Sequence, residues 1–208
     1  MINKRLKIVF LSGAGISVES GVPSYRDEDP TSIWRRYDPM EVCSLTGWNK
    51  DPQKVLDFFK EVTSGIVNCQ PNEAHKIIAD LEKDHDVVVL TQNVDDLHER
   101  AGSTTVLHIH GSLFVDKVTP QGTRPDVVLF GEDVKLLPQA IKHVKSADIF
   151  VVIGTSLEVY PVNTLTHYTM TDKKFYIDPI PKNFQEYTLI PMGAVDGMNY
   201  FKSLDIFK

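Results

Sequence analysis

The chain has few cysteines, no long apolar run and no excess of positive charge, and each absence excludes a class of protein. Its 208 residues contain two cysteines, Cys43 and Cys69, too few for a disulfide framework and fewer than structural zinc sites usually use. No stretch approaches the roughly 20 apolar residues that a membrane helix needs. The net charge of -6 argues against nucleic-acid binding through the overall field. We therefore expect a cytoplasmic protein that contacts neither a membrane nor nucleic acid directly.

Short apolar runs alternate with helical periodicity along most of the chain. Runs rich in Val, Ile and Phe, typical of strands buried on both faces, occupy residues 7–12, 86–93, 148–156 and 174–178, and a shorter, more polar run spans 104–111. Helical spacing occurs at 51–62 and 71–84. This order predicts an α/β fold with a Rossmann-like, doubly wound parallel sheet. Residues from about 27 to 70 depart from the rhythm, and we interpret them as a small helical insertion in a single domain spanning 1–208.

Polar residues follow four of the predicted strands, where ligands bind in an open parallel sheet. Because the carboxyl ends of parallel strands meet at one edge, we expect these residues to line one crevice. They are Ser12 to Ser17, Gln92 to Asp96, His108 to Gly111, and Gly154 to Ser156.

The glycines at the end of the first strand suit a phosphate site. Gly13 and Gly15 let backbone amides approach a phosphate, and we expect a helix near Ser17 to offer its positive end. The alternative is a tight turn without a ligand. Gly154, Thr155 and Ser156 repeat this chemistry at another strand end, which favours a dinucleotide over a mononucleotide.

The segment "TQNVDDLHERAG" combines two amides and a carboxylate, Gln92, Asn93 and Asp95. Such a group suits ribose hydroxyls, a carboxamide or an ordered water, although an Asx-rich helix cap has the same composition. The following side chains are expected on the solvated face of a helix: Asp96, His98, Glu99 and Arg100.

His110 lies at a strand end before Gly111, where a neutral imidazole can act as a general base. The alternative is an ordinary core or surface histidine. A metal pair of His108 and His110 is disfavoured because no carboxylate or cysteine follows at useful spacing. A triad of Ser17, Asp95 and His110 is discounted because nothing resembles a nucleophile elbow.

Taken together, five motifs resemble the sirtuins, the NAD-dependent protein-lysine deacylases. They are "GAGIS.ESGVPSYR", "TQNVDDLHERAG", "VLHIHGSL", "RPDVVLFGE" and "GTSLEVYP", and they follow the family's order across about residues 6–205. The resemblance implies an enzyme that consumes NAD and an acylated lysine peptide or protein, and releases nicotinamide, O-acyl-ADP-ribose and free lysine.

The resemblance also implies roles for individual residues, with His110 as the base. The pyrophosphate turn comprises Gly13, Ala14, Gly15, Ser17 and Glu19, and Tyr25 and Arg26 lie on a loop over the nicotinamide ribose. Gln92 and Asn93 meet that ribose and a water, and Asp95 meets the carboxamide. The adenosine half is held by Gly154, Thr155, Ser156, Asp178 and Val195. The acyl-lysine tunnel, along which the peptide adds as a strand, is lined by Val128, Phe130, Gly131, Glu132, Val159 and Tyr160.

The sequence departs from the family pattern at several positions. The family's four-cysteine zinc module is replaced by a cysteine-free segment at about 112–124, so we expect no structural zinc and a minimised second module. Tyr25 stands where Phe is usual, which favours leakage to water. Asp178 replaces an expected Asn and favours NAD over NADP. Phe59 and Val62 stand where desuccinylase-like members carry Tyr and Arg, so we expect neutral acyl groups, acetyl or longer.

Two alternatives remain open on the same scaffold. The missing zinc module and Tyr25 would also fit an NAD glycohydrolase or an ADP-ribosyltransferase. A non-catalytic module that binds NAD or ADP-ribose is the third interpretation, and the presence of His110 argues against it.

Overall fold

The computed structural model describes residues 5–22 and 36–207, and its centre is a six-stranded parallel sheet. In spatial order the strands are β3 (Val106–His108), β2 (Asp86–Thr91), β1 (Lys7–Ser12), β6 (Ile149–Ile153), β7 (Lys174–Ile177) and β8 (Thr188–Ile190). The predicted α/β class and all five predicted strands are confirmed. β8 was not predicted from the sequence.

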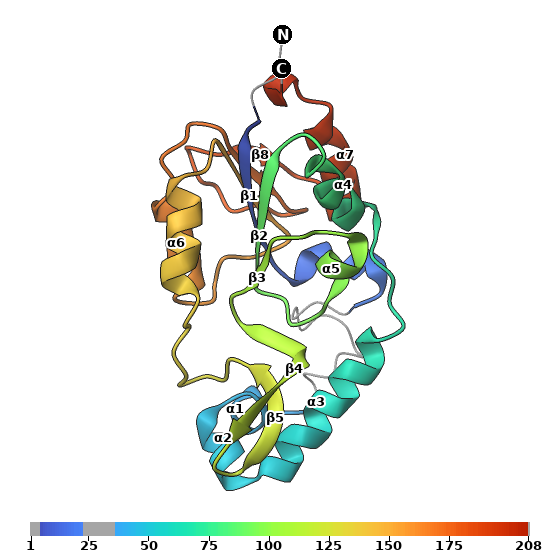
Figure 1. Ribbon diagram of the computed structural model, residues 1–208, viewed down its shortest axis with the longest axis vertical. Helices are drawn as coiled ribbons and strands as arrows, with labels where there is room; N and C mark the ends of the chain where they lie inside the picture. Colours follow the sequence, from blue (N-terminus) through green and yellow to red (C-terminus); the bar gives the residue numbers. More distant parts are fainter. Residues whose placement is uncertain (1–4, 23–35, 208) are drawn as a thin grey trace.

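Helices cover both faces of this sheet (Figure 1). On one face, α4 (Glu73–Leu81) and α7 (Ala194–Lys202) pack on the side chains of Ile8 and Phe10. On the other face, α6 (Leu137–Lys145) and the 3-10 helix η4 (Val162–His167) pack on Val9 and Leu11. Because alternate residues of a strand point to opposite faces and both faces are covered, β1 is apolar at each position from Ile8 to Leu11, between a lysine and a serine at its ends.

Capping residues fix where the predicted helices begin. Asp51 accepts a hydrogen bond from the Lys54 amide at 3.0 Å before α3 (Pro52–Ile66), whose first residue is a proline. Asn72 accepts one from the Ala74 amide at 3.0 Å before α4. The helices predicted at 51–62 and 71–84 are therefore confirmed, with boundaries shifted by a few residues.

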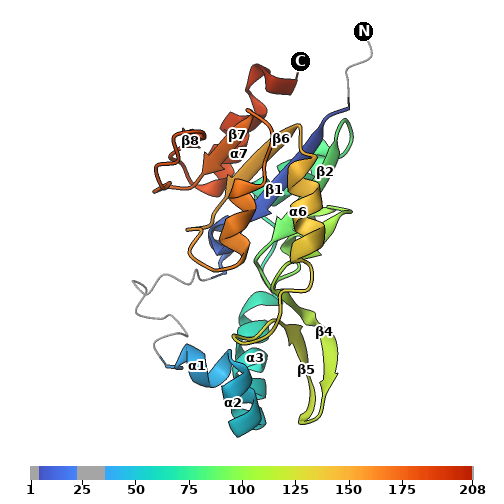
Figure 2. The ribbon, with the colours of Figure 1, turned by 90° about the vertical axis from the view of Figure 1, so that its left-hand side faces the viewer.

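A small lobe lies beside the carboxyl ends of the strands (Figures 1 and 2). It comprises α1 (Pro39–Val42), α2 (Leu45–Lys50), α3 and an antiparallel hairpin of β4 (Gly111–Thr119) and β5 (Gly122–Val127). Its core includes Trp48, Phe58, Leu113 and Leu129, contributed by helices, hairpin and the segment after it. The hairpin occupies the segment for which the sequence predicted only a minimised module. The predicted insertion boundary near residue 27 falls outside the described residues.

The chain after β1 forms two short 3-10 turns, η1 (Ala14–Ile16) and η2 (Val18–Ser20). The helix expected to begin near Ser17 is therefore a single 3-10 turn that starts at Val18 with Ser17 as its N-cap, and not an α-helix. Gly21, at φ 89°, ends the second turn, and the Val22 amide donates back to the Ser17 carbonyl at 3.2 Å. The chain thus turns away too early for a helix. None of the helices in the described residues is long and apolar enough to cross a membrane.

Candidate active site

The site begins at the point where the strand order reverses, between β1 and β6. The exits of these strands touch backbone to backbone. A Cβ added to Gly13 would lie 2.6 Å from the Thr155 Cβ, and one added to Gly15 would lie 2.7 Å from the Gly154 Cα. Gly154 itself has φ 61°, which disfavours any other residue. The three glycines therefore form a floor that is free of side chains.

The amides of Gly13 and Gly15 have backbone partners on this floor. They donate to the carbonyls of Ile153 at 3.0 Å and Gly154 at 2.8 Å. The structure thus changes the role expected of these glycines, because their amides join two strand exits instead of pointing at a phosphate. Ala14, between them, lies in η1 and is only partly buried.

Three buried polar side chains form a chain of hydrogen bonds beside this floor. The Asn93 amide nitrogen donates to Ser17 Oγ at 3.1 Å, and Ser17 Oγ donates to Asp95 Oδ2 at 3.1 Å. The Leu97 amide donates to Asp95 Oδ1 at 3.1 Å. Burial raises the pKa of Asp95, and the bonds from Leu97 and Ser17 oppose that rise. The structure therefore joins Ser17, Asn93 and Asp95, which lie far apart in the sequence, into one polar cluster.

His110 is held in one tautomer by a backbone carbonyl. Its Nδ1 lies 3.3 Å from the Gln92 carbonyl oxygen, and because a carbonyl only accepts, Nδ1 carries the proton. Nε2 then carries the lone pair. Burial lowers the pKa of His110, and the bond to Gln92 opposes this only in part. The imidazole is thus neutral near pH 7, as a general base requires.

Gln92 and Thr155 connect the ends of β2 and β6. The Gln92 side-chain nitrogen donates to Thr155 Oγ1 at 2.9 Å, and the hydroxyl of Tyr176 donates to the Thr155 carbonyl at 2.7 Å. Ser156 follows, half-buried, in the loop after β6. The polar ends of two strands are thereby fixed relative to each other across β1.

Asp178 and Val195, the two other residues expected near the adenosine, lie at the end of β7 and in the first turn of α7. Asp178 is buried at the end of β7, and its Oδ1 accepts from the Ile180 amide at 2.9 Å. The Val195 amide, in the first turn of α7, donates to Glu19 Oε1 at 3.1 Å. Glu19 therefore anchors α7 to η2 and favours the helix through its negative charge near the amino end.

A second segment, residues 128–132, ties the small lobe to His110. The Val128 amide donates to the His110 carbonyl at 2.8 Å. Phe130 pairs with the start of α2: its amide donates to the Cys43 carbonyl at 2.8 Å, and its carbonyl accepts from the Leu45 amide at 3.0 Å. The Phe130 side chain itself is 56% exposed. Gly131 follows it, and Val159 and Tyr160 are likewise exposed in the loop after β6.

A buried ion pair between Arg124 and Glu132 holds the segment 128–132 against the hairpin. Arg124 Nη2 lies 2.8 Å from Glu132 Oε2, and the guanidinium lies over the Trp48 ring at 5.6 Å. Lys117 bonds the other oxygen of Glu132 at 2.7 Å, and the Leu129 amide donates to Glu132 Oε2 at 2.9 Å. Burial alone would raise the pKa of Glu132, yet these donors lower it. The Glu132 carboxylate therefore holds the segment in place.

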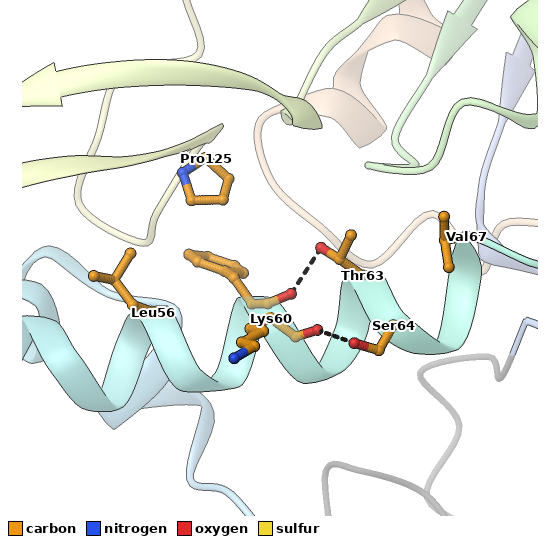
Figure 3. A pocket seen from close by; sticks show the side chains of 7 residues that line it. Leu56, Lys60, Thr63, Ser64, Val67 and Pro125 are labelled. Carbon is orange, nitrogen blue, oxygen red and sulfur yellow. Dashed lines mark hydrogen bonds between the residues drawn. The ribbon is translucent and has the colours of Figure 1, made fainter.

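A hollow with a cavity volume of about 320 Å³ lies between α3 and β5 (Figure 3). Two hydroxyls line it, and both donate to carbonyls of their own helix: Thr63 to Phe59 and Ser64 to Lys60, each at 2.8 Å. Its lining is otherwise mostly apolar: Leu56, Phe59, Lys60, Val67 and Pro125. The hollow contains none of the polar residues that cluster at the strand ends.

The sequence placed His98 wrongly and did not indicate its contact with His75. His98 was expected on a solvated helix face, but it is 1% exposed and its Nε2 lies 3.0 Å from Ser12 Oγ. It packs edge-on against His75, with ring centroids 4.8 Å apart. Because α5 (Leu97–Ala101) has only five residues, it shows no periodicity that could have indicated its buried side. Tyr25 and Arg26 lie outside the described residues.

Fold and site together define a doubly wound α/β protein with polar residues gathered at the strand ends, a neutral histidine and a small lobe bonded to the backbone of that histidine. A model of the Sir2 family matches residues 13–122 and 117–161. The NAD-dependent protein deacylase of Helicobacter pylori (strain ATCC 700392 / 26695) is 46% identical over 198 residues, covering 85% of this chain and 86% of the relative. The chain belongs to the Sir2 family.

Solved structures of the family share the fold. A mutant Sir2 homologue in complex with ADP ribose has a TM-score of 0.85 at 31% identity, covering 99% of this chain and 96% of that one. A complex described as Sir2, p53 peptide and NAD+ has a TM-score of 0.80 at 26% identity, covering 96% and 93%. The likeness therefore spans both the sheet and the small lobe.

Proposed function

We propose that this protein removes acyl groups from protein lysines in an NAD-dependent reaction. Family membership and relatives named as NAD-dependent protein deacylases support this activity. The observation that carries it is the neutral His110, whose Nδ1 is held by the Gln92 carbonyl so that Nε2 is available as a base. A protein that only binds a nucleotide would not need this tautomer.

The described residues fit NAD. Gly13, Gly15 and Gly154 pack backbone against backbone with no space for a side chain between them, so these strand ends present main chain to an extended ligand. The Ser17, Asn93 and Asp95 cluster offers a carboxylate and an amide oxygen to a carboxamide or ribose. NAD supplies nicotinamide as the leaving group and ADP-ribose as the acceptor of the acyl group.

The residues act in three ways on this reaction. The Asp95 cluster orients the nicotinamide end, and its burial excludes water, so that capture by the acyl oxygen is favoured over hydrolysis. His110 Nε2 then takes a proton from a ribose hydroxyl, which attacks the captured acyl carbon. The segment 128–132, with Val159 and Tyr160, borders the acyl-lysine, and the exposed Phe130 is available to a peptide. After this capture the lysine amine leaves the acyl carbon and one water adds to it, so that the products are free lysine, nicotinamide and O-acyl-ADP-ribose.

The acyl group is neutral, acetyl or longer. Phe59 is buried and offers no charge, and Val62 packs against the small-lobe core. A succinyl carboxylate placed there would lose its hydration without gaining a partner.

The hairpin carries no cysteine, and its side chains do not match the thiolate donors of a structural zinc site. Among the described residues, no group of three His, Cys, Asp or Glu is arranged to hold a metal ion.

The test is a product analysis with two histidine variants. Purified protein is mixed with NAD, with and without an acetyl-lysine peptide, and nicotinamide, deacetylated peptide and O-acetyl-ADP-ribose are followed by mass spectrometry. We expect peptide-dependent release of one O-acetyl-ADP-ribose per lysine. His110→Ala should lower kcat about 10²- to 10⁴-fold, whereas His143→Ala, on α6 outside the site, should match the parent. Free ADP-ribose formed without peptide, or a retained rate in His110→Ala, would contradict the proposal.

A further inference from the structure

His108 is the last residue of β3 and lies two residues before His110, which is in the turn between β3 and β4, yet the two side chains have opposite surroundings. Its Nδ1 is 3.0 Å from the Asn93 carbonyl oxygen, and its Nε2 is 2.7 Å from Glu99 Oε1 on α5. The side chain is 16% exposed. His108 therefore bridges the loop that follows β2 to the helix that follows this loop.

Both partners of the His108 ring only accept hydrogen bonds. A carbonyl oxygen and a carboxylate oxygen have no proton to donate, so both ring nitrogens must carry one. In either neutral tautomer, one nitrogen lone pair would face an oxygen lone pair at 3.0 Å or less. The contacts are thus satisfied together only by the imidazolium.

The charges around His108 agree with this geometry. Glu99 on α5 and Asp95 in the loop after β2 are the carboxylates that face it among the described residues, and His98 on α5 is neutral because burial lowers its pKa. Burial opposes the charge on His108, but the Glu99 carboxylate, together with the Asn93 carbonyl and Asp95, outweighs burial and raises the pKa of His108. Burial would likewise raise the pKa of Glu99, and the bond from His108 lowers it.

We propose that the charged His108 is a positioning residue that holds the Gln92–Asp95 loop in the conformation that binds the nicotinamide end of NAD. This rests on the proposed function, because that function assigns the loop to NAD. Through the Asn93 carbonyl, His108 fixes the backbone from which the Asn93 and Asp95 side chains project. Activity then requires His108 to be charged and His110 to be neutral at the same pH.

This arrangement yields a bell-shaped pH dependence of kcat/KM for NAD. The acidic limb belongs to His110, whose pKa is lowered by burial and which must be neutral. The alkaline limb belongs to His108, whose pKa is raised by Glu99 against the effect of burial and which must be charged. Loss of the loop's conformation should appear in KM for NAD more than in KM for the peptide.

Glu99→Gln separates the charge of the pair from its shape, since the amide oxygen still accepts from Nε2. Removing the charge lowers the pKa of His108 by about one unit, so kcat/KM above the alkaline midpoint should fall about tenfold, and the difference from the parent should disappear toward the acidic limb. Glu186→Gln removes an exposed carboxylate bonded to Lys174 on distant β7 and serves as the matched control with an unchanged profile. His108→Gln should raise KM for NAD about tenfold and leave KM for the peptide within about twofold.

NMR of the imidazole nitrogens, on protein labelled at histidine, measures the protonation states of His108 and His110 without relying on catalysis. At pH 6.5 we expect two protonated ring nitrogens for His108, assigned by their disappearance in His108→Gln, and one for His110. A neutral His108 at pH 6.5, or a Glu99→Gln profile that superimposes on that of the parent, would overturn the proposal. If the parent shows no deacylation at any pH, the proposed function fails instead, and the NMR spectrum with the pH dependence of ADP-ribose affinity still tests the role of His108.

Discussion

Removing one partner of the Arg124–Glu132 ion pair should destabilise the small lobe strongly. The Arg124 side chain is 0% exposed and that of Glu132 is 15% exposed, so neither charge can be solvated when its partner is lost. Breaking a buried pair from one side costs about 3–5 kcal/mol. Glu132→Gln leaves a buried guanidinium with only carbonyl acceptors, whereas Arg124→Met leaves a carboxylate that Lys117 still neutralises in part. We therefore expect Glu132→Gln to be the costlier change.

The assay is urea unfolding followed by circular dichroism, with thermal unfolding in parallel. A loss of 3–5 kcal/mol corresponds to a fall in Tm of roughly 6–20 °C for a chain of this size. The double variant Arg124→Met/Glu132→Leu removes both charges and should recover at least half of the loss, because a buried pair replaced by apolar residues is often close to neutral. Glu41→Gln, which breaks the exposed pair with Lys54, is the control and should cost no more than about 1 kcal/mol. A loss below about 1 kcal/mol in Glu132→Gln, or a double variant that is no more stable than Glu132→Gln, would refute the reasoning.

Three further outcomes follow from the site. Gly154→Ala places a Cβ 2.3 Å from the Ile16 amide nitrogen at φ 61°, so we expect a loss of about 2–4 kcal/mol in urea unfolding and no calorimetric NAD binding at concentrations that saturate the parent. Burial lowers the pKa of His75 to about 4, so the unfolded chain binds a proton that the folded chain does not, and the unfolding free energy should fall by roughly 1.5 kcal/mol between pH 6.5 and 5 on this account. His75→Gln should flatten that slope, and an unchanged slope would mean that His75 titrates normally. Phe59 should make succinyl-lysine peptides poor substrates, at least about tenfold below acetyl-lysine in kcat/KM, and comparable rates would contradict the assignment of the acyl site.

Features governed by strand geometry could be predicted from the sequence. The runs around Val9 and Val151 read as strands because burial on both faces leaves no polar position, and parallel strands gather their carboxyl ends at one edge. This is why Asn93 and Asp95 were expected near Ser17, and the structure brings these three together.

Features that depend on short elements or on contacts between distant residues could not be predicted. β5 contains Pro125, and apolar and polar residues alternate only weakly in both β4 and β5. The sequence of the hairpin therefore gave little indication of strands. The opposite states of His108 and His110 depend on Glu99 and on two backbone carbonyls, and the sequence specifies none of these contacts locally. The glycines were read as phosphate ligands because the sequence does not show which backbone partners their amides find.

The hydrogen bond from the Val128 amide to the His110 carbonyl has a consequence for protein engineering. This bond continues the pairing of β4 with β5 by one step, from Gly111 and Val127 to His110 and Val128. A displacement of residues 128–132 would therefore also displace the backbone of His110. Exchanging the hairpin and its following segment for those of a relative would therefore exchange part of the support of the base as well. Chimeras made to alter peptide choice should join the two sequences before β3, so that His110, the β4–β5 hairpin and residues 128–132 come from the same parent.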